Sequence, residues 1–487
     1  MNETNLPVAV IGAGPIGLAA AAHLVKRGET PLVFEAGPGA ASAIQSWAHV
    51  TLFSPWEFNV DAAAAELLAE TGWQRPPAGL LPTGGELINH YLAPLAAHPA
   101  VSPHIHYNAR VTGVSRRRHD KMKDYGRAEA PFVLQVDVAG RPERFLAKAV
   151  IDASGNWLSP NPLGADGLTA PGETAHAANI FYGIPDVLGS LRERYAGRRV
   201  AVVGGGHSAI NALLELTDLQ AEAPQTTIHW ILRKRDVTTA YGGLGADALP
   251  GRGQLGLSMK EMVDAGRVQV HTPFYVTEIE TAENGLLLAG ETPAGPATIP
   301  VDEIIAATGA RPNLSFLREI RLDLDPGVEA PPALAPLIDP NVHSCGTVRP
   351  HGEAELRQPE QGFYVVGMKS YGRAPTFLLA TGYEQVRSVV AALVGDMVAA
   401  RKVELNLPET GVCGVNLGGD DACCAPAPVV QLQELVVGEG KCCDPAPADS
   451  NACCTPVPTV QLQELKVGGD KCCEPAPAGS SACCTPL

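Results

Sequence analysis

The amino-acid sequence predicts an α/β protein with two similar parallel-sheet units and a long tail of different composition. Two observations carry this prediction. A strand, glycine turn, helix and second strand occur in residues 8–36 and again in residues 198–236, and from residue 406 onward glycine, proline and alanine dominate. A chain of 487 residues is also too long for one hydrophobic core, which fits two folded domains and an appendage.

The first copy of the pattern reads VAVIGAGPIGLAAAAHLVKRG and is followed by the strand PLVFEA. Gly12 permits a tight turn, Gly14 lets a pyrophosphate approach the backbone, and Gly17 allows close packing of helix on strand. Pro15 follows Gly14 at the expected helix start. Glu35, at the tip of the second strand, is placed to accept hydrogen bonds from a ribose. Together these features predict a Rossmann-like dinucleotide-binding domain that takes FAD.

The second copy, RRVAVVGGGHSAINALLEL, has Gly204, Gly206 and Ala209 at the three small positions. Its second strand ends in the basic trio Arg233, Lys234 and Arg235, where the first copy ends in an acid. Guanidinium groups suit a ribose 2′-phosphate, whereas a carboxylate suits a free 2′-hydroxyl. The second site is therefore predicted to bind NADPH, with His207, Ser208, Arg233 and Arg235 among its contacts. The alternative is that the basic trio is a solvated strand end.

Three further glycines follow apolar strands and are predicted to lie near the cofactors. AVIDASGNW and EIIAATGARPN are strands that end in small-residue turns with Gly155 and Gly309. Such turns let the chain pass close to a cofactor. The segment GFYVVGMKSYGRAPTFLL gives a third strand, Gly367, and a helix that we expect to begin near Thr376 and to face the electron-rich edge of the flavin.

With these paired fingerprints, residues 7–400 resemble the flavoproteins with two dinucleotide-binding domains, which include flavin-containing monooxygenases and pyridine nucleotide-disulfide reductases. The resemblance implies an FAD-binding domain made of residues 1–170 and 336–405, interrupted by an NADPH-binding domain at 171–335. Residues 406–487 remain as a flexible tail.

The branch of this family is indicated by cysteines and by one histidine. Residues 1–344 contain no cysteine, which argues against a flavin-to-disulfide relay through the core. The monooxygenases carry FxGxxxHxxx(Y/F) before the second fingerprint. The segment APGETAHAANIFYG keeps Gly172 and His176 but has Ala170 for the first aromatic residue, and Phe181 is displaced by one position. His176 is a catalytic candidate, and the alternative is a loop histidine without a redox role.

Two other catalytic candidates, Tyr371 and Arg373, are placed near the flavin by the same resemblance. Many relatives have an acid after the glycine equivalent to Gly367 to hold the ribityl chain. This sequence has Met368, so another group must do that work.

The segment LIDPNVHSCGTVRPHG, together with MKSYGRAPTFLL, resembles flavin monooxygenases encoded in bacterial arsenic-resistance gene clusters. Its single thiol, Cys345, stands between His343 and His351 and could hold a soft ion or position a substrate. The alternative is a buried structural cysteine.

A basic run, RVTGVSRRRHDKMKDYGR (Arg110 to Arg127), is predicted to form a solvated hairpin between two strands. The alternative is a patch for an anionic partner.

The tail carries adjacent cysteine pairs in a 30-residue repeat, beginning ACCAPAPVVQLQEL and again ACCTPVPTVQLQEL. Adjacent cysteines are poor disulfide partners but good chelators, and soft thiolates suit trivalent arsenic or antimony, mercury, copper(I) and zinc. The proposed ligands are Cys345, Cys423, Cys424, Cys442, Cys443, Cys453, Cys454, Cys472, Cys473, Cys483 and Cys484. The alternative is a duplicated linker with incidental cysteines.

The sequence therefore suggests an NADPH- and FAD-dependent monooxygenase that oxidises a trivalent arsenical, captured by its tail, with molecular oxygen as second substrate. Alternatives are a flavoprotein reductase of a tail-bound metal ion or disulfide, and a metal-sequestering protein with little turnover. A net charge of −16 argues against nucleic-acid binding. The N-terminal MNETNLP lacks signal-peptide features, and the most apolar helical stretch, Ile16 to Val25, is too short to cross a membrane, so we expect a cytoplasmic protein.

Overall fold

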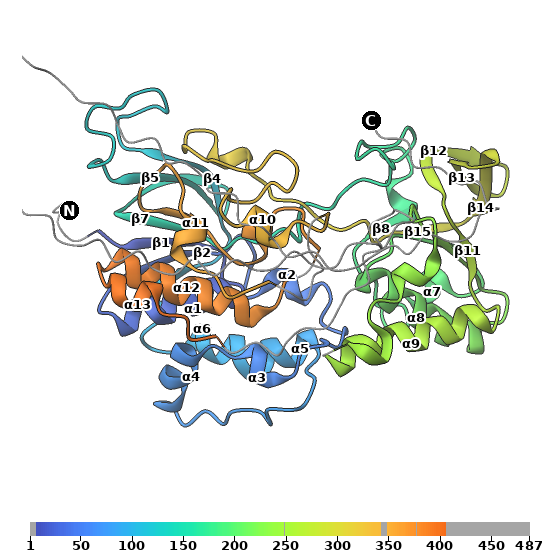
Figure 1. Ribbon diagram of the computed structural model, residues 1–487, viewed down its shortest axis with the longest axis horizontal. Coiled ribbons are helices and arrows are strands. Elements are labelled where there is room, and N and C mark those ends of the chain that lie inside the picture. Colours follow the sequence, from blue (N-terminus) through green and yellow to red (C-terminus); the bar gives the residue numbers. More distant parts are fainter. Residues whose placement is uncertain (1–5, 248, 342–347, 376, 406–487) are drawn as a thin grey trace, which may run out of the picture. The chain divides into compact units, whose positions relative to one another are not determined.

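The computed structural model describes residues 6–247, 249–341, 348–375 and 377–405. The chain divides into two units, residues 1–420 and 421–487, and all described residues lie in the first. The α/β fold with two parallel sheets is confirmed within that unit (Figure 1). No helix in these described ranges is long and apolar enough to cross a membrane.

The first parallel sheet has five strands in the order β16-β7-β1-β2-β3. These strands are β1 (Val8–Ile11), β2 (Pro31–Phe34), β3 (Ile105–His106), β7 (Ala149–Asp152) and β16 (Phe363–Val365). Alternate residues of β1 enter different cores, as the two-residue period of a strand requires. Val8 and Val10 pack with helices α1 (Pro15–Lys26) and α12 (Leu379–Leu393). Ala9 and Ile11 pack with an antiparallel sheet on the other side.

That antiparallel sheet consists of β4 (Ala109–Arg116), β5 (Phe132–Val138) and β6 (Arg141–Ala147). The basic run of the sequence thus includes most of β4 and the connection to β5. The expectation of a solvated hairpin was wrong for two of its arginines. Arg116 Nε lies 2.8 Å from Glu360 Oε1, Arg127 Nη2 lies 2.6 Å from Glu360 Oε2, and all three side chains are buried. Glu360, far along the chain, supplies the charge that allows both guanidinium groups to be buried.

The second parallel sheet repeats the plan of the first, with strand order β11-β10-β9-β15-β8. Its strands are β8 (Ile180–Tyr182), β9 (Arg199–Val203), β10 (Thr227–Ile231), β11 (Gln269–His271) and β15 (Glu303–Ala306). Val200 and Val202 of β9 pack with helices α8 (His207–Glu222) and α9 (Pro250–Asp264). Ala201 and Val203 pack with the antiparallel strands β12 (Tyr275–Ala282), β13 (Gly285–Thr292) and β14 (Gly295–Val301).

Short helices fill the connections. Five lie between β2 and β3, namely α2 (Ser42–Gln45), α3 (Trp56–Asn59), α4 (Ala62–Ala69), α5 (Gly84–Leu87) and α6 (Ala93–Ala97). The others are α7 (Arg192–Tyr195), α10 (Ala335–Ile338), α11 (Glu353–Leu356) and α13 (Met397–Arg401). The second sheet is inserted between β7 and β16 of the first, while the domain boundaries at 170 and 335 stay predictions.

Candidate functional site: two dinucleotide cradles

The first glycine turn has the geometry expected of a pyrophosphate cradle. Gly12 has a φ of +99°, and a Cβ there would lie 2.8 Å from the carbonyl oxygen of Ala153. A Cβ on Gly17 would collide with the carbonyl oxygen of Gly12, whereas a Cβ on Gly14 would meet nothing within 4 Å. Gly14 is the N-cap of α1 and Pro15 is its first residue. The open backbone above Gly14, at the positive end of the helix dipole, fits an anionic pyrophosphate.

Glu35 lies directly beside this turn. Its Oε2 accepts a hydrogen bond of 2.8 Å from the Ala13 amide, and its Oε1 accepts one of 2.9 Å from the Gly37 amide. These amides fix the carboxylate at the carboxyl end of β2. A fixed acceptor at this edge fits the ribose hydroxyls of FAD.

The second turn repeats the first. Gly204 has a φ of +139°, and a Cβ there would collide with the carbonyl oxygen of Ala307, as Gly12 would with Ala153. Gly206, the N-cap of α8, has nothing within 4 Å of its Cβ position. Each of the two predicted small-residue turns thus places a carbonyl group against the first glycine of a cradle, Ala153 against Gly12 and Ala307 against Gly204. Gly155 and Gly309 within those turns have φ of +67° and +83°.

His207 and Ser208 open helix α8. Burial, reinforced by the positive charge of Arg252, lowers the pKa of His207 to about 4. The imidazole is therefore neutral near pH 7 and can donate or accept a hydrogen bond at the helix start without carrying charge. Its ring lies 5.3 Å from the ring of Phe53.

The basic trio lies just beyond the end of β10. Arg233 and Arg235 are exposed, and one Arg233 nitrogen donates a 2.9 Å hydrogen bond to the carbonyl of Ala165. Lys234 Nζ donates to the carbonyl of Thr239 at 2.6 Å. Exposed guanidinium groups at this edge fit a 2′-phosphate, and their role stays a prediction.

A buried ion pair that was not predicted from the sequence joins Asp152, the last residue of β7, to Lys369. Lys369 Nζ is 2.7 Å from Asp152 Oδ2, and both side chains are fully buried. Ser154 donates to Asp152 Oδ1 from its amide at 3.1 Å and its hydroxyl at 2.7 Å. The available signal was Asp152 itself, a charged residue at the end of the otherwise apolar strand AVID.

A second cluster of buried polar side chains surrounds Gly367. The residue after Gly367, where the resemblance leads one to expect an acid, is Met368. Gln385 Oε1 accepts a 2.7 Å hydrogen bond from the Gly367 amide. Gln385 Nε2 lies 2.9 Å from both His351 Nε2 and Ser370 Oγ, and His351 Nδ1 lies 3.0 Å from the Arg349 carbonyl. Both nitrogens of His351 are thus engaged in hydrogen bonds, and Cys345 lies outside the described residues. The helix expected near Thr376 begins at Leu379, and residue 376 lies outside the described residues.

The three catalytic candidates lie in different surroundings. Tyr371 is buried against His351 and Phe377, and burial raises the pKa of its phenol well above the usual range. Arg373 is exposed. His176 Nε2 lies 3.2 Å from Thr281 Oγ1 on β12. Among the described residues, no hydrogen bond, ion pair or ring contact joins these three side chains, and their catalytic roles stay predictions.

All 12 cysteines of the chain, including the eleven proposed thiolate ligands, lie outside the described residues. The prediction of a soft metal or metalloid site therefore rests on the sequence alone.

Two cradles with glycine turns, an acid beside one and arginines beside the other, define a flavin-dependent oxidoreductase that uses a nicotinamide cofactor. The chain belongs to the pyridine nucleotide-disulphide oxidoreductase family, whose sequence profile matches residues 9–344. The resemblance to flavoproteins with two dinucleotide-binding domains is thereby confirmed. The matched region ends one residue before the first cysteine of the chain.

Relatives of several activities share the fold. A ferredoxin–NADP reductase of Streptococcus equi subspecies zooepidemicus is 24% identical over 329 residues, which cover 66% of this chain and 79% of that protein. A bacillithiol disulfide reductase of Bacillus cereus matches with a TM-score of 0.60 at 21% identity, over 82% of this chain and 99% of that one. An FAD-bound cadaverine monooxygenase of Erwinia amylovora matches with a TM-score of 0.55 at 12% identity, over 84% and 96%. These structural matches show the fold and leave the reaction open.

Proposed function

We propose that the protein is an NADPH- and FAD-dependent monooxygenase that oxidises a thiophilic metalloid compound, a trivalent arsenical, captured by its cysteine-pair tail. The observation that carries this proposal is the lack of cysteine in the segments that build the two cradles. Both cradles are built from residues 1–344 and 367–385, and these segments contain no cysteine. A disulfide relay needs a thiol pair beside the flavin, so electron delivery to oxygen fits this core better.

The chain's own residues bind and orient the two cofactors. The amides at the start of α1 and the carboxylate of Glu35 would hold the pyrophosphate and ribose of FAD. The start of α8, with Arg233 and Arg235, would hold NADPH. Bound FAD supplies the redox chemistry. The buried Asp152–Lys369 pair and the Gln385 amide fix the backbone around the turns that would line it.

The overall reaction balances with one oxygen molecule. The arsenic lone pair is oxidised and gains one oxygen atom, so that arsenic passes from the trivalent to the pentavalent state. The second oxygen atom leaves as water, with NADPH and a proton supplying two electrons and the protons. Thiolates of the tail would raise the local arsenical concentration and would not change the chemical step.

The proposal is tested with the FAD-loaded full chain by measuring oxygen uptake and NADPH oxidation with and without a trivalent arsenical. Equal stimulation of both rates, with a pentavalent product, is the expected result. A matched variant with the ten paired tail cysteines changed to serine keeps chain length and charge. We expect it to retain kcat and to show a higher KM for the arsenical.

The family and the ferredoxin–NADP reductase relative favour a second candidate, an NADPH-dependent reductase of a tail-bound metal ion or disulfide. NADPH consumption without oxygen uptake, dependent on the tail cysteines, would establish this reductase and exclude the monooxygenase. Arsenical binding to the tail with little NADPH turnover in any variant would instead indicate a sequestering protein.

A further inference from the structure

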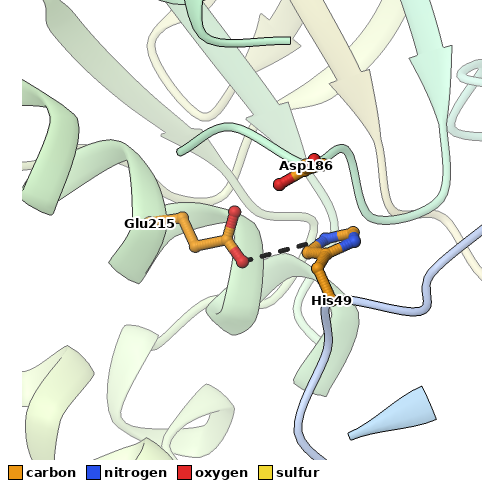
Figure 2. Close-up of side chains that lie close together, drawn as sticks. All are labelled: His49, Asp186 and Glu215. Carbon is orange, nitrogen blue, oxygen red and sulfur yellow. Dashed lines mark ion pairs between the residues drawn. The ribbon is translucent and has the colours of Figure 1, made fainter. Parts of the chain in front are cut away.

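His49, Asp186 and Glu215 come together from three separate segments outside both cradles. His49 lies between α2 and α3, in the part of the chain that builds the first sheet. Asp186 follows β8 and Glu215 is on α8, so both belong to the second sheet's part. One ligand atom from each residue lies within 4.8 Å of the other two, and all three side chains are partly buried. Figure 2 shows the imidazole and both carboxylates facing a common centre.

A direct ion pair does not satisfy this cluster. His49 Nε2 lies 3.8 Å from Glu215 Oε1, which is beyond hydrogen-bond distance. The same Nε2 atom is buried and has no hydrogen-bond partner. Among the described residues, neither carboxylate is paired with a lysine or arginine. Apart from the 3.8 Å pair between His49 and Glu215, the described residues place no cation beside the two carboxylates.

The carboxylates are also held in place from behind. Asp186 Oδ2 accepts hydrogen bonds of 2.7 Å from the Ser190 amide and 2.9 Å from the Ser190 hydroxyl, and Oδ1 accepts one of 3.1 Å from the Gly189 amide. Glu215 Oε2 accepts a 3.1 Å hydrogen bond from the Val187 amide. Such outer contacts orient ligands in metal sites and leave the facing lone pairs available.

We propose that His49, Asp186 and Glu215 form a site for a divalent first-row transition metal ion that ties the two sheet-bearing parts of the chain together. One imidazole nitrogen and two carboxylate oxygens suit Mn²⁺, Fe²⁺ or Zn²⁺. Metal–ligand bonds of about 2.0–2.2 Å place ligand atoms roughly 3–4 Å apart, so small side-chain rotations close the present cluster. Water completes the coordination shell.

Manganese is the probe that separates this site from the tail, because its preference for oxygen and nitrogen donors keeps it off soft thiolates. Free Mn²⁺ is titrated against the FAD-loaded full chain, and the loss of its solution EPR signal reports binding. We expect one Mn²⁺ per chain. His49→Ala and Glu215→Gln should each weaken binding by about tenfold or more.

Asp218→Asn is the matched control, because Asp218 is an exposed carboxylate on the same helix, three residues beyond Glu215 and outside the cluster. It should leave Mn²⁺ affinity within about twofold of the unmodified chain, since it supplies no ligand. If His49→Ala does not fold, Glu215→Gln decides alone, because glutamine keeps the volume and the acceptor for the Val187 amide. An unchanged EPR signal with the unmodified chain, or equal effects of Glu215→Gln and Asp218→Asn, overturns the proposal.

Discussion

Substituting Lys369 by methionine tests how the core around the first cradle is held together. Lys369 Nζ contacts Asp152 at 2.7 Å and Ser154 Oγ at 3.0 Å, and it lies 4.5 Å from the centre of the Phe316 ring. Neither member of the ion pair has any exposed surface. Removing one partner of such a pair leaves an uncompensated charge in a medium of low polarity, which costs about 3–5 kcal/mol.

This loss corresponds to a fall in melting temperature of about 6–10 °C, at about 2 °C per kcal/mol for a large cooperative unit. The measurement is thermal unfolding of the FAD-loaded protein, followed by circular dichroism and flavin fluorescence. Lys148→Met is the control, because its ion pair with Glu29 is 42% and 22% exposed and such surface pairs contribute about 0–1 kcal/mol. The double variant Lys369→Met with Asp152→Asn should recover most of the loss, since no buried charge remains. A Lys369→Met protein that melts within about 2 °C of the unmodified chain would refute the reasoning.

Three further outcomes follow from the cradles. Gly17→Ala should lose flavin because its methyl group meets the Gly12 carbonyl, whereas Gly14→Ala has room to fold and should lose only affinity, measured as FAD bound per chain. Arg235→Ala should raise the KM for NADPH by about tenfold, the worth of a charge-assisted hydrogen bond, and leave the KM for NADH within about twofold. The pKa of His207 is about 4 when folded, below its usual 6.5, so its stabilising contribution is complete above pH 6.5 and is lost as the pH falls toward 4. As the pH falls from 6.5 toward 4, the unmodified chain should lose this stability and His207→Gln should not. The melting temperature of His207→Gln minus that of the unmodified chain should therefore increase as the pH is lowered.

The features that the sequence predicted well are those determined by a few neighbouring residues. Gly12 and Gly204 have positive φ because the chain must turn between a strand and a helix. A glycine directly after four apolar residues is enough to predict such a turn from the sequence. Even the small-residue turns could be assigned to the cradles, because Gly155 and Gly309 each follow a short apolar strand.

The features that were missed depend on residues that are far apart in sequence. Asp152 and Lys369 are separated by 217 positions, and Arg116 and Glu360 by 244. Nothing local to either residue shows its partner, and a charged residue in a sequence is more often solvated than buried. The cluster of His49 was missed for the same reason, because it forms only when the two sheet-bearing parts meet.

The positions of the cysteines in the sequence limit how this chain could relay electrons through a disulfide of its own. A disulfide relay passes electrons from the flavin to a disulfide formed by two cysteines of the protein, and residues 1–344 contain no cysteine. Any cysteine of this chain that takes part in such a relay must therefore be Cys345 or lie beyond it, where ten of the remaining eleven cysteines occur as adjacent pairs. Such pairs form strained disulfides but chelate soft ions well, so they suit substrate capture better than an electron relay. Segments that build the two cradles without any cysteine, followed by a cysteine-rich tail, therefore support the proposal of an enzyme that would collect a thiophilic substrate and oxidise it with oxygen.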